Sequence, residues 1–192
     1  MSARERILDA AAGVMRRQGI AATTTREIAR EAGCSEALLY KNFTDKQELF
    51  VAVLKERAPR LNSPDSLVGT RTVRENVETF VEWLLMFYVE SFPIAASIFG
   101  SPSLLEAHRR SVDRIGAGPE YPALLVQNYL EAEITEGRVD RNTDTRALSR
   151  ALTGAALFEA FQAVYAGRTS VEDPPGTARS IVAALDTGIP RG

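Results

Sequence analysis

Apolar residues recur at steps of three and four along most of the chain, and no segment alternates with the two-residue period of a strand. The clearest case lies near the start, where the apolar positions are Ile7, Leu8, Ala11, Ala12 and Met15. The pattern predicts an all-α protein of about nine helices. A stretch of proline and small polar residues, 59–70, predicts a boundary between an N-terminal domain, residues 1–58, and a second domain, residues 59–192.

Four short helices are predicted before residue 59, and each has its own start signal. Capping-box spacing, in which a Ser or Thr is followed three residues later by Glu or Gln, occurs at Ser2–Glu5, Thr24–Glu27 and Thr44–Gln47. Ser35 is the predicted cap of the remaining helix. Gly19 and Gly33 are expected to end the first two helices, because glycine adopts the left-handed conformation at a helix end without strain.

The second domain begins with a long helix that is predicted from Val73 to Ser91 and is apolar almost all round, as expected of the middle of a bundle. Its longest apolar run, Trp83–Val89, is far shorter than the roughly twenty residues that cross a bilayer. Pro93, Gly100 and Pro102 are expected to interrupt the segment after this helix. The later predicted helices are Ser103–Ile115, Tyr121–Gly137, one capped by Asn142 or Thr143 and running to about Ala166, and Ala178–Leu185.

The charge balance differs between the two predicted domains. The whole chain carries a formal net charge of −2, with 23 Lys and Arg against 25 Asp and Glu. Residues 1–58 hold ten of the basic and eight of the acidic residues, and all three lysines, so they carry +2 and the remainder carries −4. The sign favours an N-terminal domain that binds phosphates. Glu131, Glu133 and Glu136 are predicted to form a solvated helix face.

Cys34 is the only cysteine, which excludes an intrachain disulfide and favours a reducing compartment. It is either a packing residue or a redox sensor. The N-terminus lacks the basic-then-apolar pattern of a signal peptide. We therefore expect a cytoplasmic protein with no membrane partner.

Residues 24–43 have the arrangement of a helix-turn-helix unit. Gly33 supplies the turn, and Ala29 with Leu38 or Leu39 supplies the contact between the helices. In such a unit the second helix presents its N-terminal side chains to base edges in the major groove. The residues so placed are Ser35, Glu36 and Ala37, followed one turn later by Tyr40 and Lys41.

The pattern T-x-R-E-I-A-R-E-A-G-C-S-E-A-L-L-Y-K-N-F-x-D-K-Q-E-L, from Thr24 to Leu49, resembles the DNA-binding domain of the TetR family of transcriptional regulators. The Leu-Tyr-x-x-Phe and Asp-Lys-x-x-Leu elements stand at the family's spacing. The resemblance implies a three-helix helix-turn-helix domain followed by a helical bundle for effector binding and dimerisation. Ala37 stands where the family often has Gly, and Asn42 where it often has His.

The resemblance also implies roles for single residues. Five would contact DNA phosphates: Thr24, Thr25, Arg26, Tyr40 and Lys46. Four would face the bases: Ser35, Glu36, Ala37 and Lys41. Glu36 would accept from a cytosine amine, and Lys41 would donate to guanine.

The second domain is rich in aromatic residues, which either line a cavity between helices or simply form the core. The candidates for binding a small, mostly apolar effector are Trp83, Phe87, Phe99, His108, Tyr129 and Phe158. His108 is the only histidine and has no partners at metal-ligand spacing, so neither a metal nor a cofactor is expected. The alternative for His108 is a surface or hydrogen-bonding residue.

Small and apolar residues on the last two predicted helices resemble the family's dimerisation pair: Ala151, Gly154, Ala155, Ile181 and Leu185. A homodimer places two recognition helices about 34 Å apart, which suits a palindromic operator in double-stranded DNA. The expected function is a ligand-responsive repressor that an unknown small-molecule effector releases from DNA.

Two rival classes remain open, an all-α enzyme or ligand carrier and a scaffold protein that does not bind DNA. An enzyme would show a nucleophile with its base, paired carboxylates in an apolar setting, or metal-ligand spacing. The sequence shows none of these patterns, so no catalytic residue is expected.

Overall fold

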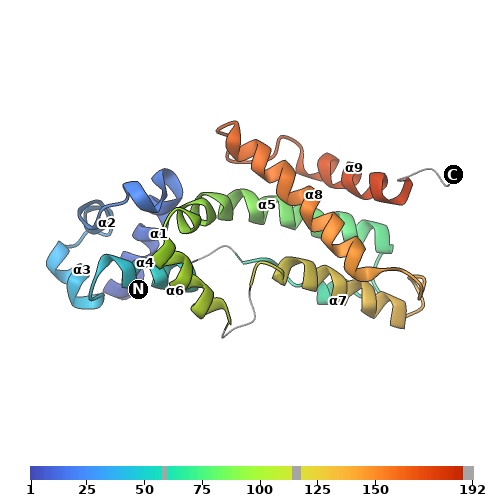
Figure 1. The fold of residues 1–192 in the computed structure, drawn as a ribbon, viewed down its shortest axis with the longest axis horizontal. Coiled ribbons are helices and arrows are strands. Elements are labelled where there is room, and N and C mark those ends of the chain that lie inside the picture. Colours follow the sequence, from blue (N-terminus) through green and yellow to red (C-terminus); the bar gives the residue numbers. More distant parts are fainter. Residues whose placement is uncertain (58–59, 114–117, 188–192) are drawn as a thin grey trace. The chain divides into compact units, whose positions relative to one another are not determined.

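The computed structural model describes residues 1–57, 60–113 and 118–187, which form nine α-helices, one short 3-10 helix and no strand (Figure 1). The predicted all-α fold is confirmed. The predicted boundary at residues 58 and 59 and the last two residues of the predicted helix Ser103–Ile115 lie outside the described residues.

The N-terminal helices are α1 (Ala3–Ala22), α2 (Thr25–Glu31), α3 (Glu36–Asn42) and α4 (Lys46–Glu56). The capping boxes predicted at Ser2 and Thr24 are both present. The third prediction was wrong by one residue, because Asp45 rather than Thr44 caps α4. The Asp45 carboxylate accepts from the Glu48 amide at 2.7 Å, and the Glu48 carboxylate in turn accepts from the Thr44 amide at 2.6 Å.

Gly19 was expected to end the first helix, but it marks a kink within α1. Its φ of 75° is left-handed, and helical conformation resumes after it as far as Ala22. The Ile20 amide donates to the Ser97 hydroxyl of α5 at 3.0 Å, and the Thr23 hydroxyl donates to the Gly19 carbonyl at 2.6 Å. These bonds replace the helical ones that the kink breaks.

The remaining elements are η1 (Pro64–Leu67), α5 (Val73–Phe99), α6 (Pro102–Asp113), α7 (Tyr121–Thr135), α8 (Thr145–Tyr165) and α9 (Pro174–Thr187). Contrary to the prediction, α5 does not end at Ser91 but continues through Pro93. Proline removes one helical hydrogen bond, and the burial of Ile94 and Ile98 holds the segment beyond it in a helix. The Ser97 hydroxyl donates to the Pro93 carbonyl at 2.9 Å.

The ends of the last two helices also differ from the prediction. Asp144 caps α8 through a bond from the Ala147 amide at 2.9 Å, whereas Asn142 or Thr143 was expected. The last helix begins at Pro174 rather than Ala178, because proline is readily accommodated in the first turn of a helix. The Asp173 carboxylate accepts from the Gly176 amide at 3.1 Å at this start.

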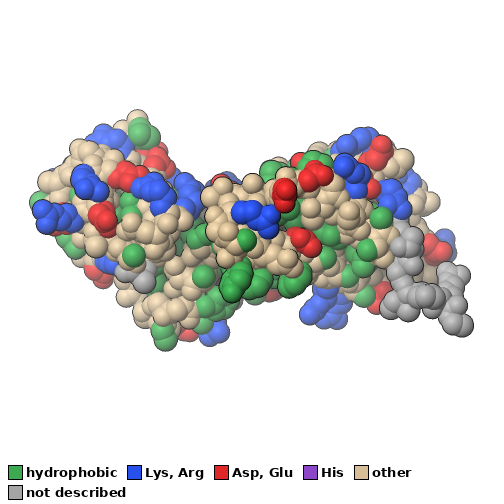
Figure 2. Space-filling view, turned by 90° about the horizontal axis from the view of Figure 1, so that it is seen from above, with side chains coloured by type: hydrophobic (Ala, Val, Ile, Leu, Met, Phe, Trp, Pro, Cys, Tyr) green, Lys and Arg blue, Asp and Glu red, His purple; other side chains and the backbone are tan. Residues whose placement is uncertain are grey.

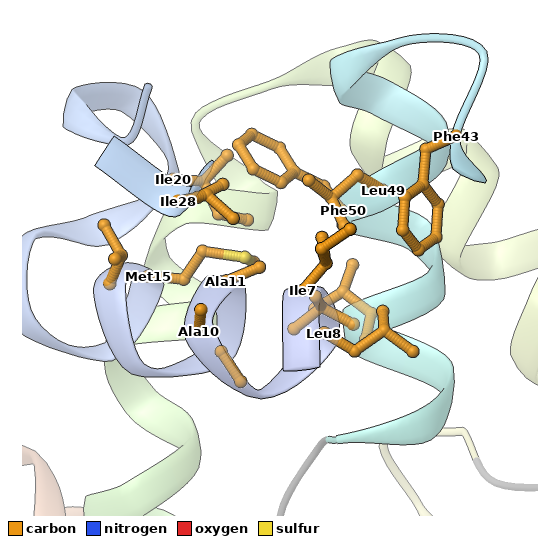
Figure 3. Close-up of a cluster of buried hydrophobic side chains, with 14 of the residues drawn as sticks. Ile7, Leu8, Ala10, Ala11, Met15, Ile20, Ile28, Phe43, Leu49 and Phe50 are labelled. Carbon is orange, nitrogen blue, oxygen red and sulfur yellow. The ribbon is translucent and has the colours of Figure 1, made fainter. Parts of the chain in front are cut away.

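The chain forms two compact units. Residues 1–59 and 90–118 contribute to the first unit, and residues 60–89 and 119–192 to the second. The first unit therefore includes the end of α5 and α6, which the sequence-based division assigns to the second domain. Side chains of α1 to α4 form its core (Figure 3), together with Ile94, Ile98 and Leu104. The second core gathers side chains of α5, α7, α8 and α9.

Helix α5 is the only helix in the described part of the chain that is long and apolar enough to cross a membrane. Its buried apolar side chains belong to the two cores and to a smaller cluster: Val77, Phe80, Val81, Leu84 and Leu85 in one core, Ile94 and Ile98 in the other, and Val89 in the cluster. Packing between helices therefore accounts for its apolar composition.

Candidate nucleic-acid interface

The turn between α2 and α3 has the predicted geometry. Gly33 has a φ of 65°, and no neighbouring atom of the described residues lies within 4 Å of where its Cβ would stand, so the backbone conformation calls for glycine. The Cys34 amide donates to the Ala29 carbonyl at 2.9 Å and closes the turn. Ala29 and Leu39 are both buried, and they hold the two helices together.

Thr24 caps α2, and both of its hydrogen-bond donors bind the side chain of Glu27. Its amide and its hydroxyl donate to the Glu27 carboxylate at 3.2 and 2.8 Å. The Thr24 hydroxyl and the Gln18 side-chain amide hold the pKa of Glu27 below its usual value. Both donors of Thr24 are therefore engaged within the protein, although the sequence suggested that this hydroxyl contacts a phosphate.

A pair of hydroxyls joins the start of α2 to α3. The Thr25 hydroxyl lies 3.3 Å from the Tyr40 hydroxyl, and the Tyr40 side chain is 47% exposed. Arg26, the next residue of α2, is exposed as well. One edge of the unit thus presents two hydroxyls, the N-terminus of a helix and a guanidinium. Each of these groups binds phosphate oxygens.

The four residues predicted to face bases are all exposed: Ser35, Glu36, Ala37 and Lys41. The Ser35 hydroxyl accepts from the Leu38 amide at 3.2 Å, and its proton stays available to donate. Figure 2 shows basic side chains interspersed with acidic ones at the left, the end at which Figure 1 labels α2 and α3. The side-chain amide of Asn42 donates to the Leu38 carbonyl of its own helix at 2.8 Å.

Lys46 is the first residue of α4 and lies on a different element from the other eight predicted DNA-binding residues. Its side chain is half-buried, and its ammonium stands 5.1 Å from the centre of the Phe50 ring. It forms no ion pair with any residue that the structure describes.

Comparison with known proteins supports a helix-turn-helix unit in this part of the chain. The pattern of the family described as bacterial regulatory proteins, tetR family, matches residues 7–53. The protein YvkB of Bacillus subtilis (strain 168), an uncharacterized HTH-type transcriptional regulator, is 44% identical over 59 residues, which make up 31% of this chain and 31% of that protein.

Two solved structures extend the likeness in fold over nearly the whole chain. One is a protein of Mesorhizobium loti MAFF303099 assigned to the TetR family, with a TM-score of 0.77 and 19% identity over 96% of this chain and 94% of that chain. The other is the regulator FadR of Bacillus subtilis in complex with stearoyl-CoA, with a TM-score of 0.65 and 15% identity over 97% and 99%. Residues 7–53 therefore carry the helix-turn-helix pattern of the tetR family, and the whole chain shares the fold of these two structures.

The residues predicted to bind an effector are divided between the two units of the chain. Trp83, Phe87, Tyr129 and Phe158 belong to the second unit, whereas Phe99 and His108 belong to the first. Tyr129 is buried, but Phe99 and Phe158 are 74% and 57% exposed. Burial lowers the pKa of the half-buried His108. A cavity of about 590 Å³ lies in the first unit, and none of the six residues lines it.

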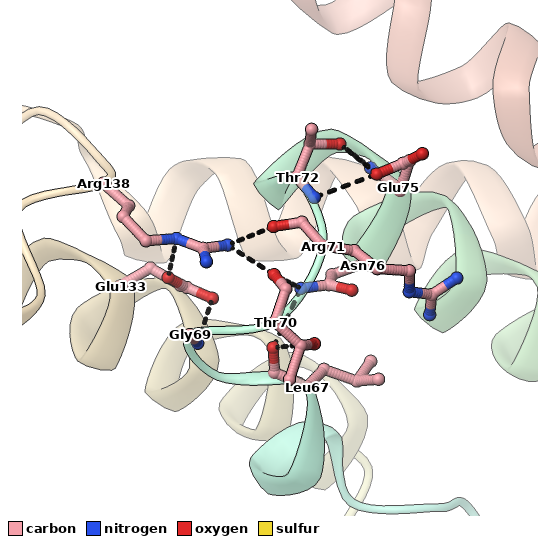
Figure 4. Close-up of polar contacts among 9 residues, drawn as sticks. All are labelled: Leu67, Gly69, Thr70, Arg71, Thr72, Glu75, Asn76, Glu133 and Arg138. Atoms are coloured by element: carbon pink, nitrogen blue, oxygen red, sulfur yellow. Dashed lines mark hydrogen bonds and ion pairs between the residues drawn. The ribbon is translucent and has the colours of Figure 1, made fainter.

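A buried polar cluster in the second unit was not predicted. Asn76, Tyr129 and Glu133 are almost completely buried, so the expectation that Glu133 lies on a solvated face was wrong. The Glu133 carboxylate pairs with the Arg138 guanidinium at 2.8 Å and accepts from the Gly69 amide at 3.3 Å (Figure 4). Burial raises the pKa of Tyr129 to about 12.

Arg138 also donates to the carbonyls of Thr70 and Arg71, at 2.8 and 2.9 Å. The Asn76 side-chain amide donates to the Leu67 and Thr70 carbonyls. By contrast, the Asn76 Oδ1 and the Tyr129 hydroxyl make no hydrogen bond of good geometry with any described residue, although the Asn76 and Glu133 side chains lie close enough to Tyr129 to affect its pKa. From the sequence, Tyr129 was expected to contribute only its ring, and no local pattern marks the polar atoms around it.

The predicted dimer residues lie on α8 and α9. Ala151 and Gly154 are exposed, Leu185 is 39% exposed, and Ile181 is partly buried against the second core. Large apolar residues that follow them along α8 are also exposed, and none of these was assigned to the interface from the sequence: Leu157, Phe158, Phe161 and Tyr165. Exposed Phe158 thus shares a helix face with Gly154 and Ala151.

Among the described residues, no group of three or more His, Cys, Asp or Glu side chains is placed to hold a metal ion. Cys34 is a free cysteine, partly buried against the first core.

Proposed function

We propose that this protein is a ligand-responsive transcriptional repressor of the TetR family, which binds a palindromic operator as a homodimer and leaves it when an effector binds. The observation that carries the proposal is the hydroxyl pair of Thr25 and Tyr40, 3.3 Å apart, beside the exposed start of α3. In this assignment residues 1–58 form the DNA-binding domain and residues 59–192 the effector and dimerisation domain.

Phosphate binding would come from the edge where α2 begins. Thr25 and Tyr40 offer hydroxyl donors, Arg26 offers its guanidinium, and Lys46 offers an ammonium from the start of α4. Thr24 supports this site as the cap of α2, because its donors are bound to Glu27. Contacts of this kind fix the position of the protein on the duplex and make its affinity fall with salt.

Base recognition would come from the exposed first turns of α3. Glu36 suits a cytosine amine, Lys41 suits the acceptors of guanine, and Ser35 suits either a donor or an acceptor. The Ala37 methyl is suited to a thymine methyl. One helix reads only a few base pairs, so a dimer with two such helices is needed for a specific site.

The apolar face of α8 is the proposed dimer interface, with Leu185 and Ile181 of α9. Ala151 and Gly154 allow close approach of a second helix, and exposed Phe158 and its neighbours supply apolar area. The exposure of Phe158 favours this role over a place in a pocket wall.

The proposed effector is small and mostly apolar and binds in the second unit. Trp83 and Phe87 would contact its apolar part, and the unpartnered Tyr129 hydroxyl would contact a polar atom. The related fold of FadR in complex with stearoyl-CoA supports an effector with an apolar portion. A cytoplasmic location fits a partner that is chromosomal DNA.

The test measures binding of the full chain to the DNA that flanks its own gene, by fluorescence anisotropy at several salt concentrations. We expect salt-sensitive binding that weakens about tenfold in Tyr40→Phe, because a hydrogen bond to a charged group contributes about 1.5–3 kcal/mol. Tyr121→Phe removes a partly exposed hydroxyl from α7 and serves as the matched control. Absence of salt-sensitive binding in the wild type would refute the proposal, as would equal weakening by both variants.

A further inference from the structure

The cavity of about 590 Å³ in the first unit is largely open to solvent and has an apolar floor. Ile20, Phe50 and Leu104 are buried side chains that line it, from α1, α4 and α6. Ile20 and Phe50 lie together in the core of this unit (Figure 3). The volume is within the range of about 300–1,000 Å³ that is usual for small-molecule sites.

Polar groups stand around the rest of the cavity. The lining includes Lys46 and Gln47 at the start of α4, and Ser101 and Ser103 at the start of α6. The hydroxyls of Ser101 and Ser103 lie 3.4 Å apart, so they can donate to one shared acceptor. An apolar floor with a few polar groups at its edge is the usual composition of a small-molecule site.

The charge of this lining is entirely positive. Among the described residues that line it, Lys46 is the one that carries a charge, and its ammonium lies over the ring of Phe50. The two acidic side chains at the start of α4 accept hydrogen bonds from backbone amides. Asp45 accepts from the Glu48 amide, and Glu48 accepts from the Thr44 amide. Neither carboxylate pairs with Lys46, so its charge stays available to an anion.

We propose that this cavity binds a compact amphipathic carboxylate, whose apolar body packs on Ile20, Phe50 and Leu104 and whose carboxylate pairs with Lys46. The Ser101 and Ser103 hydroxyls donate to its second oxygen. An uncharged molecule of the same shape loses the ion pair and leaves the Lys46 ammonium beside an apolar group. The site therefore selects for one negative charge.

The site is separate from the effector site of the proposed function, since its lining belongs to the first unit. One consequence does rest on that function: Lys46 is also a proposed phosphate contact, so a bound carboxylate and DNA would compete for the same ammonium. Binding of the carboxylate is measured without DNA, so its failure and the failure of DNA recognition are distinguishable.

The test measures binding of phenylbutyrate to the full chain by isothermal titration calorimetry, with phenylbutanol as the uncharged control. We expect phenylbutyrate to bind at least tenfold more tightly than phenylbutanol. Lys46→Met should remove most of this difference, whereas Arg30→Met, which removes an exposed cation of α2 outside the cavity, should leave it unchanged. Equal affinity for the acid and the alcohol would overturn the proposal, and so would an unchanged affinity in Lys46→Met.

Two further variants fill the cavity. Ala96 and Ser103 are exposed residues of its lining, so Ala96→Trp and Ser103→Trp add volume there while leaving the core intact. Either variant that keeps the wild-type melting temperature should lose phenylbutyrate binding. Wild-type affinity in both would place the carboxylate elsewhere and overturn the proposal.

Discussion

At the scale of single residues, the buried polar cluster shows how burial changes the chemistry of a side chain. The Tyr129 hydroxyl lies in the second core without a hydrogen-bond partner among the described residues, and burial raises its pKa to about 12 from the ordinary value of 10.0. Burial raises the pKa of Tyr88 to about 12 as well. Two tyrosines thus favour the protonated form when the chain is folded.

These pKa shifts predict a loss of stability in alkali. Below pH 10 both residues are protonated in the folded and the unfolded chain, so neither makes stability depend on pH. Between pH 10 and pH 12 they ionise in the unfolded chain first, which lowers the free energy of unfolding until both states are ionised. Urea unfolding at pH 8, 10 and 11.5 should show this fall.

Tyr129→Phe separates the contribution of Tyr129 from that of Tyr88. The variant removes an unpartnered buried hydroxyl, so at pH 8 its free energy of unfolding should equal or exceed that of the wild type. Its alkaline loss should be about half as large, because Tyr88 remains. A loss as large as that of the wild type would show that Tyr129 does not titrate in this range.

At the scale of elements, the turn between α2 and α3 depends on one backbone conformation. Gly33 has a φ of 65° and open space around its Cβ position. Gly33→Ala should therefore lower the free energy of unfolding by roughly 1–2 kcal/mol through backbone strain alone. Gly33→Asn should lose less, because asparagine tolerates the left-handed region. Thermal or urea unfolding measures the loss of stability in each variant. Equal losses in the two variants would mean that the φ of residue 33 does not limit the stability of this turn.

The N-terminal elements could be predicted because their signals are local. Ser2 and Thr24 find their partners three residues away, and Gly33 acts on its own backbone. The start of α4 was misplaced by one residue because Thr44 and Asp45 are both good caps, and the short bond of Asp45 to the Glu48 amide decides between them.

Features that depend on distant residues could not be predicted from local patterns. Helix α5 passes Pro93 because residues beyond it are buried against α1 and α4, and the sequence does not show this packing. Glu133 looks like part of a charged face, yet its carboxylate binds the amide of Gly69, 64 positions earlier. The cavity beside Lys46 combines residues of several helices and was likewise invisible in the sequence.

At the scale of the whole molecule, the proposed function depends on a second copy of the chain. The α8 side chains Leu157, Phe158 and Phe161 are 41%, 57% and 43% exposed, and Tyr165 at the end of the helix is 85% exposed. These positions share one helix face with Gly154. An apolar patch of this kind on a water-facing helix indicates a surface that a partner covers, and a second α8 is a self-complementary partner.

Phe158→Glu should convert the dimer to a monomer, because two carboxylates would meet at the centre of the interface without a cation. Since Phe158 is exposed in the single chain, the variant should stay folded, with the free energy of unfolding of the monomer changed by only about 0.5 kcal/mol. Met86→Glu, on α5 in the same unit, replaces a side chain that is 50% exposed and should leave the dimer intact. Sedimentation equilibrium measures the oligomeric state of both variants.

The monomeric variant should also bind a palindrome at least tenfold more weakly than the wild type does, because only a dimer joins two recognition helices. Its affinity for an isolated half-site should equal that of the wild type. A dimeric Phe158→Glu variant would place the interface on another surface, and a monomer that binds the palindrome as tightly as the wild type would separate dimerisation from recognition of DNA.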